Sequence, residues 1–161
     1  MTANFEIEPL DKLNFNAFFS LIEELAAYEK LPPPDTEAKK RLKQDGLAAN
    51  PKYNAYLARS DDQYIGYVIY FMTYSSFIAL PTLYLEDIFI LKQYRRQGVG
   101  TKFFEFCLSR AKALGCGRIE FCVLDWNTPA QNFYDKLGAQ RLGWLFYRVN
   151  REQIENSKLE S

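Results

Sequence analysis

The 161-residue sequence contains no histidine. This absence excludes Ser-His-Asp and Cys-His catalytic triads, and any zinc site with histidine ligands. Cysteine is also scarce: Cys107, Cys116 and Cys122 are odd in number and lack metal-ligand spacing. We interpret them as reduced thiols of a cytoplasmic protein and expect no bound metal. Acid–base catalysis would therefore have to come from carboxylates, tyrosine, cysteine or lysine.

A net charge and long apolar runs are missing as well. The 20 Lys and Arg residues balance the 20 Asp and Glu residues, so the broad basic field that nucleic acids require is absent. No apolar run has the length of a membrane span, and the first ten residues do not resemble a signal peptide. The length and the 48% hydrophobic content predict one globular domain over residues 1–161, with residues 150–161 as a polar tail.

The hydrophobic pattern predicts alternating strands and helices. Apolar residues recur at helical spacing from Asn14 to Tyr28, Thr36 is placed to cap a second helix, and Thr128 and Gln131 form a capping box for a short late helix. The predicted strands cover residues 5–8, 53–59, 64–74, 82–90, 118–124 and 141–149. This order predicts an α/β fold with a mixed sheet that is mostly antiparallel early and has helical crossovers late.

The stretch from Leu83 to Phe104 (LYLEDIFILKQYRRQGVGTKFF) predicts a buried strand, a basic glycine loop and the start of a helix. Backbone N–H groups and the helix dipole make such a loop suited to phosphate. It lacks the Gly-Lys-Ser/Thr of a P-loop, and Phe103 replaces the third glycine of a dinucleotide fingerprint. The pattern Arg/Gln-x-x-Gly-x-Gly/Ala, which carries coenzyme A pyrophosphate in the Gcn5-related N-acetyltransferases, fits Arg95-Arg-Gln-Gly98-Val-Gly100. Taken alone, the loop is also compatible with an ordinary glycine turn and solvated arginines.

Three segments together resemble one branch of that superfamily, the spermidine/spermine (diamine) and thialysine N-acetyltransferases. They are YLEDIFILKQYRRQGVGTK around the loop, LDWNTPAQNFYDKLGA from Leu124, and LIEELAAYE from Leu21. The resemblance implies the GNAT fold, with a central mixed sheet splayed between its two central parallel strands and flanked by helices. It also implies acetyl-CoA as cosubstrate, and a homodimer in which the aromatic strands and the C-terminal segment are candidate contacts.

By the same resemblance, cofactor contacts fall on the central strand, the glycine loop and the start of the late helix. These positions are Ile88, Phe89, Ile90, Arg95, Arg96, Gln97, Gly98, Val99, Gly100, Thr101, Asn127, Thr128, Pro129 and Ala130. Ile88 to Ile90 are equally compatible with a plain core strand, because a core strand can still bind a ligand through its backbone.

The resemblance makes Tyr134 the candidate general acid for the departing thiolate, although one of eleven tyrosines is often only a half-buried aromatic. Glu86 is the candidate general base, acting through a water, with an ion pair to Lys or Arg as the alternative. Strand alternation puts Glu86 with Ile88 on one face and Asp87 with Phe89 on the other. Asp87 fits structural hydrogen bonding and substrate contact equally well. Tyr28 and Glu29 match amine-site positions, or form the exposed end of a helix.

Ser75-Ser76-Phe77 stands where the polyamine enzymes carry an acidic segment, and Val123-Leu-Asp-Trp-Asn127 looks like the thialysine-acetylating members. We therefore predict transfer of acetyl to a small primary amine: thialysine, a lysine-like amino acid or a diamine, with polyamines poorer. Two alternatives are a peptide or protein acetyltransferase of the same fold, and a non-catalytic acyl-CoA sensor. Nothing in the sequence shows a peptide groove, and retention of Glu86 and Tyr134 disfavours the sensor.

Overall fold

The computed structural model describes residues 4–157. The chain divides into two compact units, Met1–Cys122 and Val123–Ser161. The first holds the sheet, with strands β1 (Glu6–Pro9), β2 (Asn54–Ser60), β3 (Gln63–Ser75), β4 (Leu80–Ile90) and β5 (Arg118–Glu120), and the helices α1 (Phe15–Glu29), α2 (Thr36–Gly46), η1 (Lys92–Tyr94) and α3 (Val99–Ala113). The second holds α4 (Thr128–Lys136) and α5 (Arg151–Glu155).

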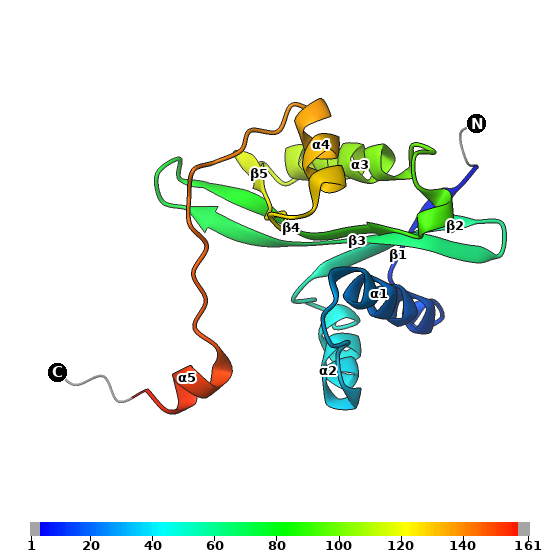
Figure 1. The fold of residues 1–161 in the computed structure, drawn as a ribbon, viewed down its shortest axis with the longest axis horizontal. Helices are drawn as coiled ribbons and strands as arrows, with labels where there is room; N and C mark the ends of the chain where they lie inside the picture. Colours follow the sequence, from blue (N-terminus) through cyan, green and yellow to red (C-terminus); the bar gives the residue numbers. More distant parts are fainter. Residues whose placement is uncertain (1–3, 158–161) are drawn as a thin grey trace. The chain divides into compact units, whose positions relative to one another are not determined.

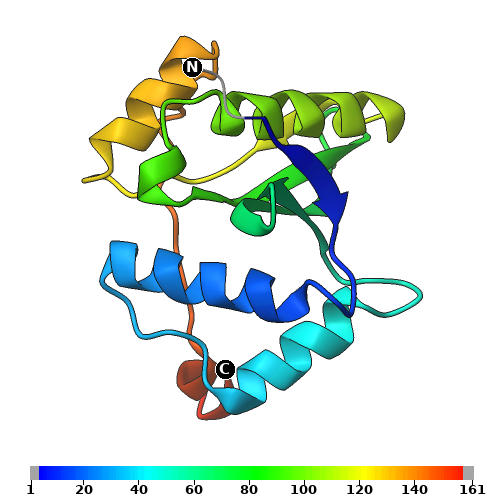
Figure 2. The same cartoon turned by 90° about the vertical axis from the view of Figure 1, so that its right-hand side faces the viewer.

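The strands form one sheet in the order β1-β2-β3-β4-β5. Neighbouring strands are antiparallel except for β4 and β5, which run parallel. Helices α1 and α2 lie on one face of the sheet and α3 on the other (Figures 1 and 2). The predicted mixed, mostly antiparallel sheet between helices is confirmed.

The buried core follows the helical spacing of the sequence. On α1 the phenylalanines Phe15, Phe18 and Phe19 are buried, and they pack in one cluster with Tyr67, Ile69 and Phe89 of the sheet. Phe18 meets Tyr67 edge to face, with ring centroids 5.2 Å apart. On the other face, α3 buries Val99, Phe103, Phe104, Cys107 and Ala111. Burial of this apolar surface is what holds both helices on the sheet.

Beyond its first three pairs, β4 separates from β5. The parallel ladder joins Thr82, Leu83 and Tyr84 to Arg118, Ile119 and Glu120, and β5 then ends. Within the described residues, β4 therefore continues from Leu85 to Ile90 without a strand partner on that side. This is the splay expected between the parallel strands, and it leaves backbone hydrogen-bonding groups available to another partner.

Several local predictions are wrong. Strand β5 ends at Glu120 rather than at residue 124. The cap of α2 is Asp35, whose carboxylate accepts from the Ala38 N–H at 2.7 Å, and Thr36 is the first helical residue. The cap of α4 is Asn127 rather than Thr128. In both helices the residue before the predicted cap has a short side-chain oxygen that reaches the N3 backbone N–H, so each helix begins one residue earlier than predicted.

The last predicted strand, residues 141–149, is not a strand. The segment is extended and has no ladder partner in the described part of the chain. It exposes most of its large apolar side chains: Leu142, Trp144, Leu145, Phe146, Tyr147 and Val149. Strand propensity becomes a strand only where a neighbouring strand satisfies the backbone hydrogen-bonding groups, and among the described residues segment 141–149 is paired with none.

Candidate acetyltransferase site

A β-bulge in β4 positions the carboxylate that the sequence singled out as a base. The pairing of β3 with β4 runs from Ile69 opposite Asp87 directly to Tyr70 opposite Leu85, and this leaves Glu86 unpaired. A bulge of this kind shifts the alternation of side chains along the strand. The predicted alternation of side chains between the two faces of the strand therefore fails at Glu86. Asp87 and Phe89 do lie on one face of β4, where they pair with Ile69 and Tyr67 of β3.

Glu86, Asp87 and Glu29 form one electrostatically coupled group. Burial, and then the charges of Glu86 and Glu29, raise the pKa of Asp87 to about 7. Burial, and then the charge of Glu86, raise the pKa of Glu29 above its ordinary value. None of the three carboxylates is within 4.0 Å of a Lys or Arg nitrogen in the described residues. The alternative of an ion pair for Glu86 is therefore not observed, and the group is suited to a cationic ligand.

Tyr67 is a member of this site that sequence reasoning missed. Its side chain is fully buried, and its hydroxyl lies 3.4 Å from Asp87 Oδ2. Burial, followed by the charge and hydrogen bond of Asp87, raises the pKa of Tyr67 far above the ordinary value. The hydroxyl is therefore protonated and donates to Asp87, which fixes that carboxyl group. Only the register between β3 and β4 reveals this contact, so no local sequence signal could have shown it.

The loop after β4 has the backbone geometry expected of an anion site. Arg96 and Gly98 both have left-handed backbone, with φ of 62° and 88°. Gly98 caps α3 without a side-chain hydrogen bond. The first intrahelical bond of α3 runs from the Lys102 N–H to the Gly98 carbonyl, so the N–H groups of Val99, Gly100 and Thr101 precede the helical ladder. These groups and the helix dipole fit a pyrophosphate.

Arg95 contacts the end of β4 and α1. Its Nε donates to the Ile90 carbonyl at 2.8 Å, and its guanidinium lies 4.7 Å from the centroid of the Tyr28 ring and 5.7 Å from that of Phe89. Arg95 thus ties the loop to the end of β4 and to α1. Of the predicted amine-site residues, Tyr28 and Glu29 are the last two residues of α1.

The remaining candidates lie in the second unit. Asn127 Oδ1 accepts from the Ala130 N–H at 3.3 Å, which starts α4 and orders Thr128 and Pro129 as its first residues. Gln131 does not complete a capping box, because its side chain donates to the carbonyls of Leu124 and Asp125. Tyr134 is half-buried on α4, and its ring contacts Phe133 at 5.0 Å between centroids.

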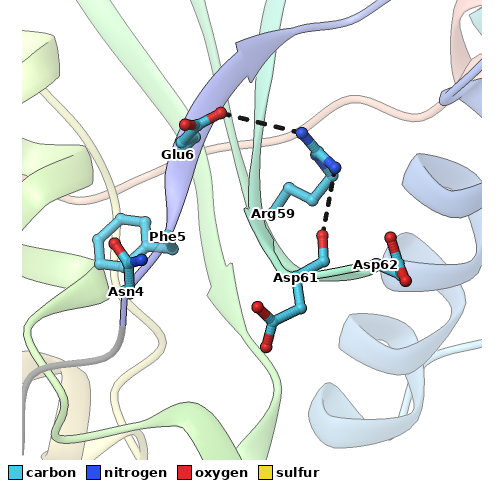
Figure 3. A pocket seen from close by; sticks show the side chains of 6 residues that line it. All are labelled: Asn4, Phe5, Glu6, Arg59, Asp61 and Asp62. Carbon is cyan, nitrogen blue, oxygen red and sulfur yellow. Dashed lines mark hydrogen bonds and ion pairs between the residues drawn. The ribbon is translucent and has the colours of Figure 1, made fainter.

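Two of the cavities formed by the described residues lie outside the carboxylate group. One, of about 410 Å³, lies between β1 and the turn from β2 to β3; Arg59 spans it toward Glu6 and the Asp61 carbonyl (Figure 3). None of its lining residues is a predicted site residue. The other, of about 340 Å³, includes Tyr28, Phe89 and Arg95 in its lining.

Among the residues that the structure describes, no cluster of three or more His, Cys, Asp or Glu could hold a metal ion, and no helix is long and apolar enough to span a membrane.

Comparison with known proteins identifies relatives of this chain. The chain is 36% identical over 146 residues to a thialysine N-epsilon-acetyltransferase of Mus musculus, covering 83% of this chain and 85% of the relative. It is 45% identical over 91 residues to an L-ornithine N5-acetyltransferase of Arabidopsis thaliana, covering 56% of this chain and 40% of the relative.

A solved structure supports the fold. The structure of AAC(6')-Iy in complex with the bisubstrate analog CoA-S-monomethyl-acetylneamine superposes with a TM-score of 0.77 at 21% identity, over 92% of this chain and 99% of the other. Residues 17–139 match the acetyltransferase (GNAT) family. The chain belongs to the GNAT family of acetyltransferases, which use acetyl-CoA.

Proposed function

We propose that this protein transfers acetyl from acetyl-CoA to the primary amine of thialysine, a lysine-like amino acid or a diamine. One observation carries the proposal: Glu29, Glu86 and Asp87 form a carboxylate group on and beside the splayed strand that leads into the phosphate loop, and no Lys or Arg of residues 4–157 forms an ion pair with it. A small ammonium ion provides the missing positive charge. The family match over residues 17–139 spans both units, which supports their acting together as one acetyltransferase domain.

The residues fit acetyl-CoA at two places within the first unit. The open edge of β4 at Ile88, Phe89 and Ile90 offers backbone groups to the pantetheine arm, and the loop from Arg96 to Thr101 offers N–H groups to the pyrophosphate. By the family resemblance, Asn127, Thr128, Pro129 and Ala130 at the start of α4 are further proposed cofactor contacts. When bound, acetyl-CoA supplies an activated acetyl group, whose carbon–sulfur bond breaks as the bond to the amine nitrogen forms.

The chain's own residues manage two protons. An alkyl ammonium, with a pKa of about 10, must lose a proton before its nitrogen can attack. Glu86, exposed on the bulge, accepts that proton through a water. Coenzyme A departs as a thiolate, whose conjugate thiol we compare with that of cysteine, with a pKa of about 8.5. Its departure is easier when the sulfur is protonated, and Tyr134 donates that proton.

Thiol release from acetyl-CoA over a panel of amines tests the proposal. We expect thialysine, lysine, ornithine and short diamines to be acetylated with higher kcat/KM than spermidine or a lysine-containing peptide. If spermidine had the highest value, the substrate assignment would be wrong. Preference for the peptide would favour a protein acetyltransferase, and tight acetyl-CoA binding without turnover of any amine would favour a sensor.

Replacing the base tests its assigned role. Glu86→Gln should lower kcat/KM for lysine about 100-fold or more at pH 7, which is within the usual range for a general base. The loss should shrink as the pH approaches about 10, where the free amine no longer needs a base. Glu105→Gln, an exposed change on α3, is the matched control. A Glu86→Gln deficit that is equal at all pH values would contradict the proton-accepting role.

A further inference from the structure

A cavity of about 340 Å³ lies between the C-terminal half of α1 and the segment that follows β4, entirely within the first unit. This volume is in the range of small-ligand sites. Its apolar wall includes Tyr28, Phe89 and Leu91. Its charged groups are Glu24, Lys92 and Arg95, so two cations and one carboxylate give the cavity a net charge of +1.

Arg95 is held in this wall with its guanidinium group oriented. The Nε–H donates to the Ile90 carbonyl, and the guanidinium carbon lies over the Tyr28 and Phe89 rings, 4.7 and 5.7 Å from their centroids. Because Nε is used in that hydrogen bond, the two terminal nitrogens Nη1 and Nη2 are the Arg95 donors best suited to bind a ligand carboxylate. Within residues 4–157, neither the Lys92 ammonium nor the Glu24 carboxylate has an ion pair within 4.0 Å. The cavity therefore offers two cations and an anion that are available to a ligand.

The cavity is next to the carboxylate group, and the two have opposite charge. Tyr28 lines the cavity, while its neighbour Glu29 belongs to the carboxylate group. Phe89 lines the cavity, while Asp87 lies two residues before it on the same face of β4. Two strand residues span about 7 Å, which is similar to the length of the four-carbon stem of lysine. A ligand with an ammonium at one end and a carboxylate at the other matches this arrangement.

We propose that this cavity is the subsite that binds the α-carboxylate and α-ammonium of a basic amino acid substrate, and that its charged residues select such substrates over diamines. Arg95 and Lys92 bind the α-carboxylate, and Glu24 binds the α-ammonium. Arg95 thus serves the substrate in this proposal, in place of the cofactor contact that the resemblance implies. The side-chain ammonium then extends to Glu29, Glu86 and Asp87. A diamine lacks the carboxylate and would place its second cation against Arg95 and Lys92. The inference rests on the proposed function and selects one of its two substrate classes.

Lysine and 1,5-diaminopentane form a matched pair, because they differ only in the α-carboxylate. We expect kcat/KM for lysine to exceed that for the diamine about 10-fold or more, mainly through KM, since one charge-assisted interaction has about this effect. In Lys92→Glu the preference should fall about 10-fold or invert. Lys12→Glu, an exposed lysine outside the cavity lining, makes the same charge change and should leave the preference unaltered.

Equal or better turnover of the diamine by the unsubstituted protein would overturn this inference and leave the proposed function standing. An unchanged preference in Lys92→Glu, or an equal change in Lys12→Glu, would overturn the assignment of the cavity. Failure to acetylate any amine would overturn the proposed function together with the inference. Lys92 is exposed, so Lys92→Glu is expected to fold, and an unchanged Tm checks this.

Discussion

Asp87 is a carboxyl group whose protonation is linked to folding. The pKa of this half-buried group is raised from 3.8 in the ordinary carboxyl group to about 7 in the folded chain, mainly because partial burial disfavours the charged form. Between these two values the folded state binds more protons than the unfolded state. The free energy of unfolding therefore falls as the pH rises from about 4 to about 7. A bound ammonium would offset this cost by stabilising the charged form.

Asp87→Asn should remove this pH dependence. Relative to the unsubstituted protein, the variant should gain about 2–4 kcal/mol in the free energy of unfolding between pH 5 and pH 8, because about three pKa units are involved. Asn retains an oxygen that can accept from Tyr67, so the hydrogen bond survives. Denaturant unfolding at both pH values measures the difference, with the exposed turn residue Asp62→Asn as control. Parallel curves for Asp87→Asn and the unsubstituted protein would show that Asp87 is ionised throughout.

A second prediction for a single residue concerns Tyr134, the proposed general acid. Tyr134→Phe removes only the hydroxyl and keeps the aromatic contact with Phe133. We expect kcat to fall about 10²- to 10⁴-fold, as is usual for loss of a general acid, while the Kd for acetyl-CoA changes little. Tyr147→Phe, an exposed tyrosine of the same unit, should keep full turnover. Unchanged kcat in Tyr134→Phe would remove Tyr134 from the mechanism.

At the scale of elements, the sequence predicted most strands and helices but not the local irregularities. The aromatic and β-branched run of β3 and the phenylalanine spacing of α1 depend on local composition, so both elements are where the pattern indicated. The bulge at Glu86 depends instead on how β3 and β4 align, which no single strand encodes. The contact of Tyr67 with Asp87 and that of Arg95 with Tyr28 likewise join elements distant in sequence. The residues within a local motif could therefore be identified from the sequence, whereas the residues that contact them from other elements could not.

Gly66 shows how closely β3 approaches the proposed cofactor strand. A Cβ at this position would meet the Phe89 carbonyl oxygen at 2.5 Å and the Ile90 Cα at 3.2 Å. Gly66→Ala must therefore displace β4 where its backbone is proposed to bind pantetheine. We expect a loss of about 1–3 kcal/mol in the free energy of unfolding and weaker acetyl-CoA binding. Gly143→Ala has open space around its new Cβ and serves as control; equal stability of the two variants would contradict this account of Gly66.

At the scale of the whole molecule, the segment after α4 exposes a run of large apolar side chains. Trp144, Leu145, Phe146 and Tyr147 are each at least 72% exposed. The β3–β4 hairpin of the first unit also exposes Tyr74 and Phe77. Exposed apolar groups at this density are typical of protein interfaces. They support the homodimer that the resemblance implies, with the aromatic strands and the C-terminal segment as contacts.

Light scattering should therefore give a mass near twice 18.8 kDa. Phe146→Asp, which puts a charge in the middle of the exposed segment, should weaken the dimer about 100-fold or more, since burying an unpaired charge costs several kcal/mol. Glu152→Asp, a change in the polar helix α5 that follows the exposed segment, should leave the mass unchanged. If the unsubstituted protein is a monomer at micromolar concentration, the exposed aromatics have another role. If Phe146→Asp stays dimeric, the contact lies elsewhere. Tyr74 and Phe77 would then be the positions to replace, because both are exposed aromatic residues of the β3–β4 hairpin.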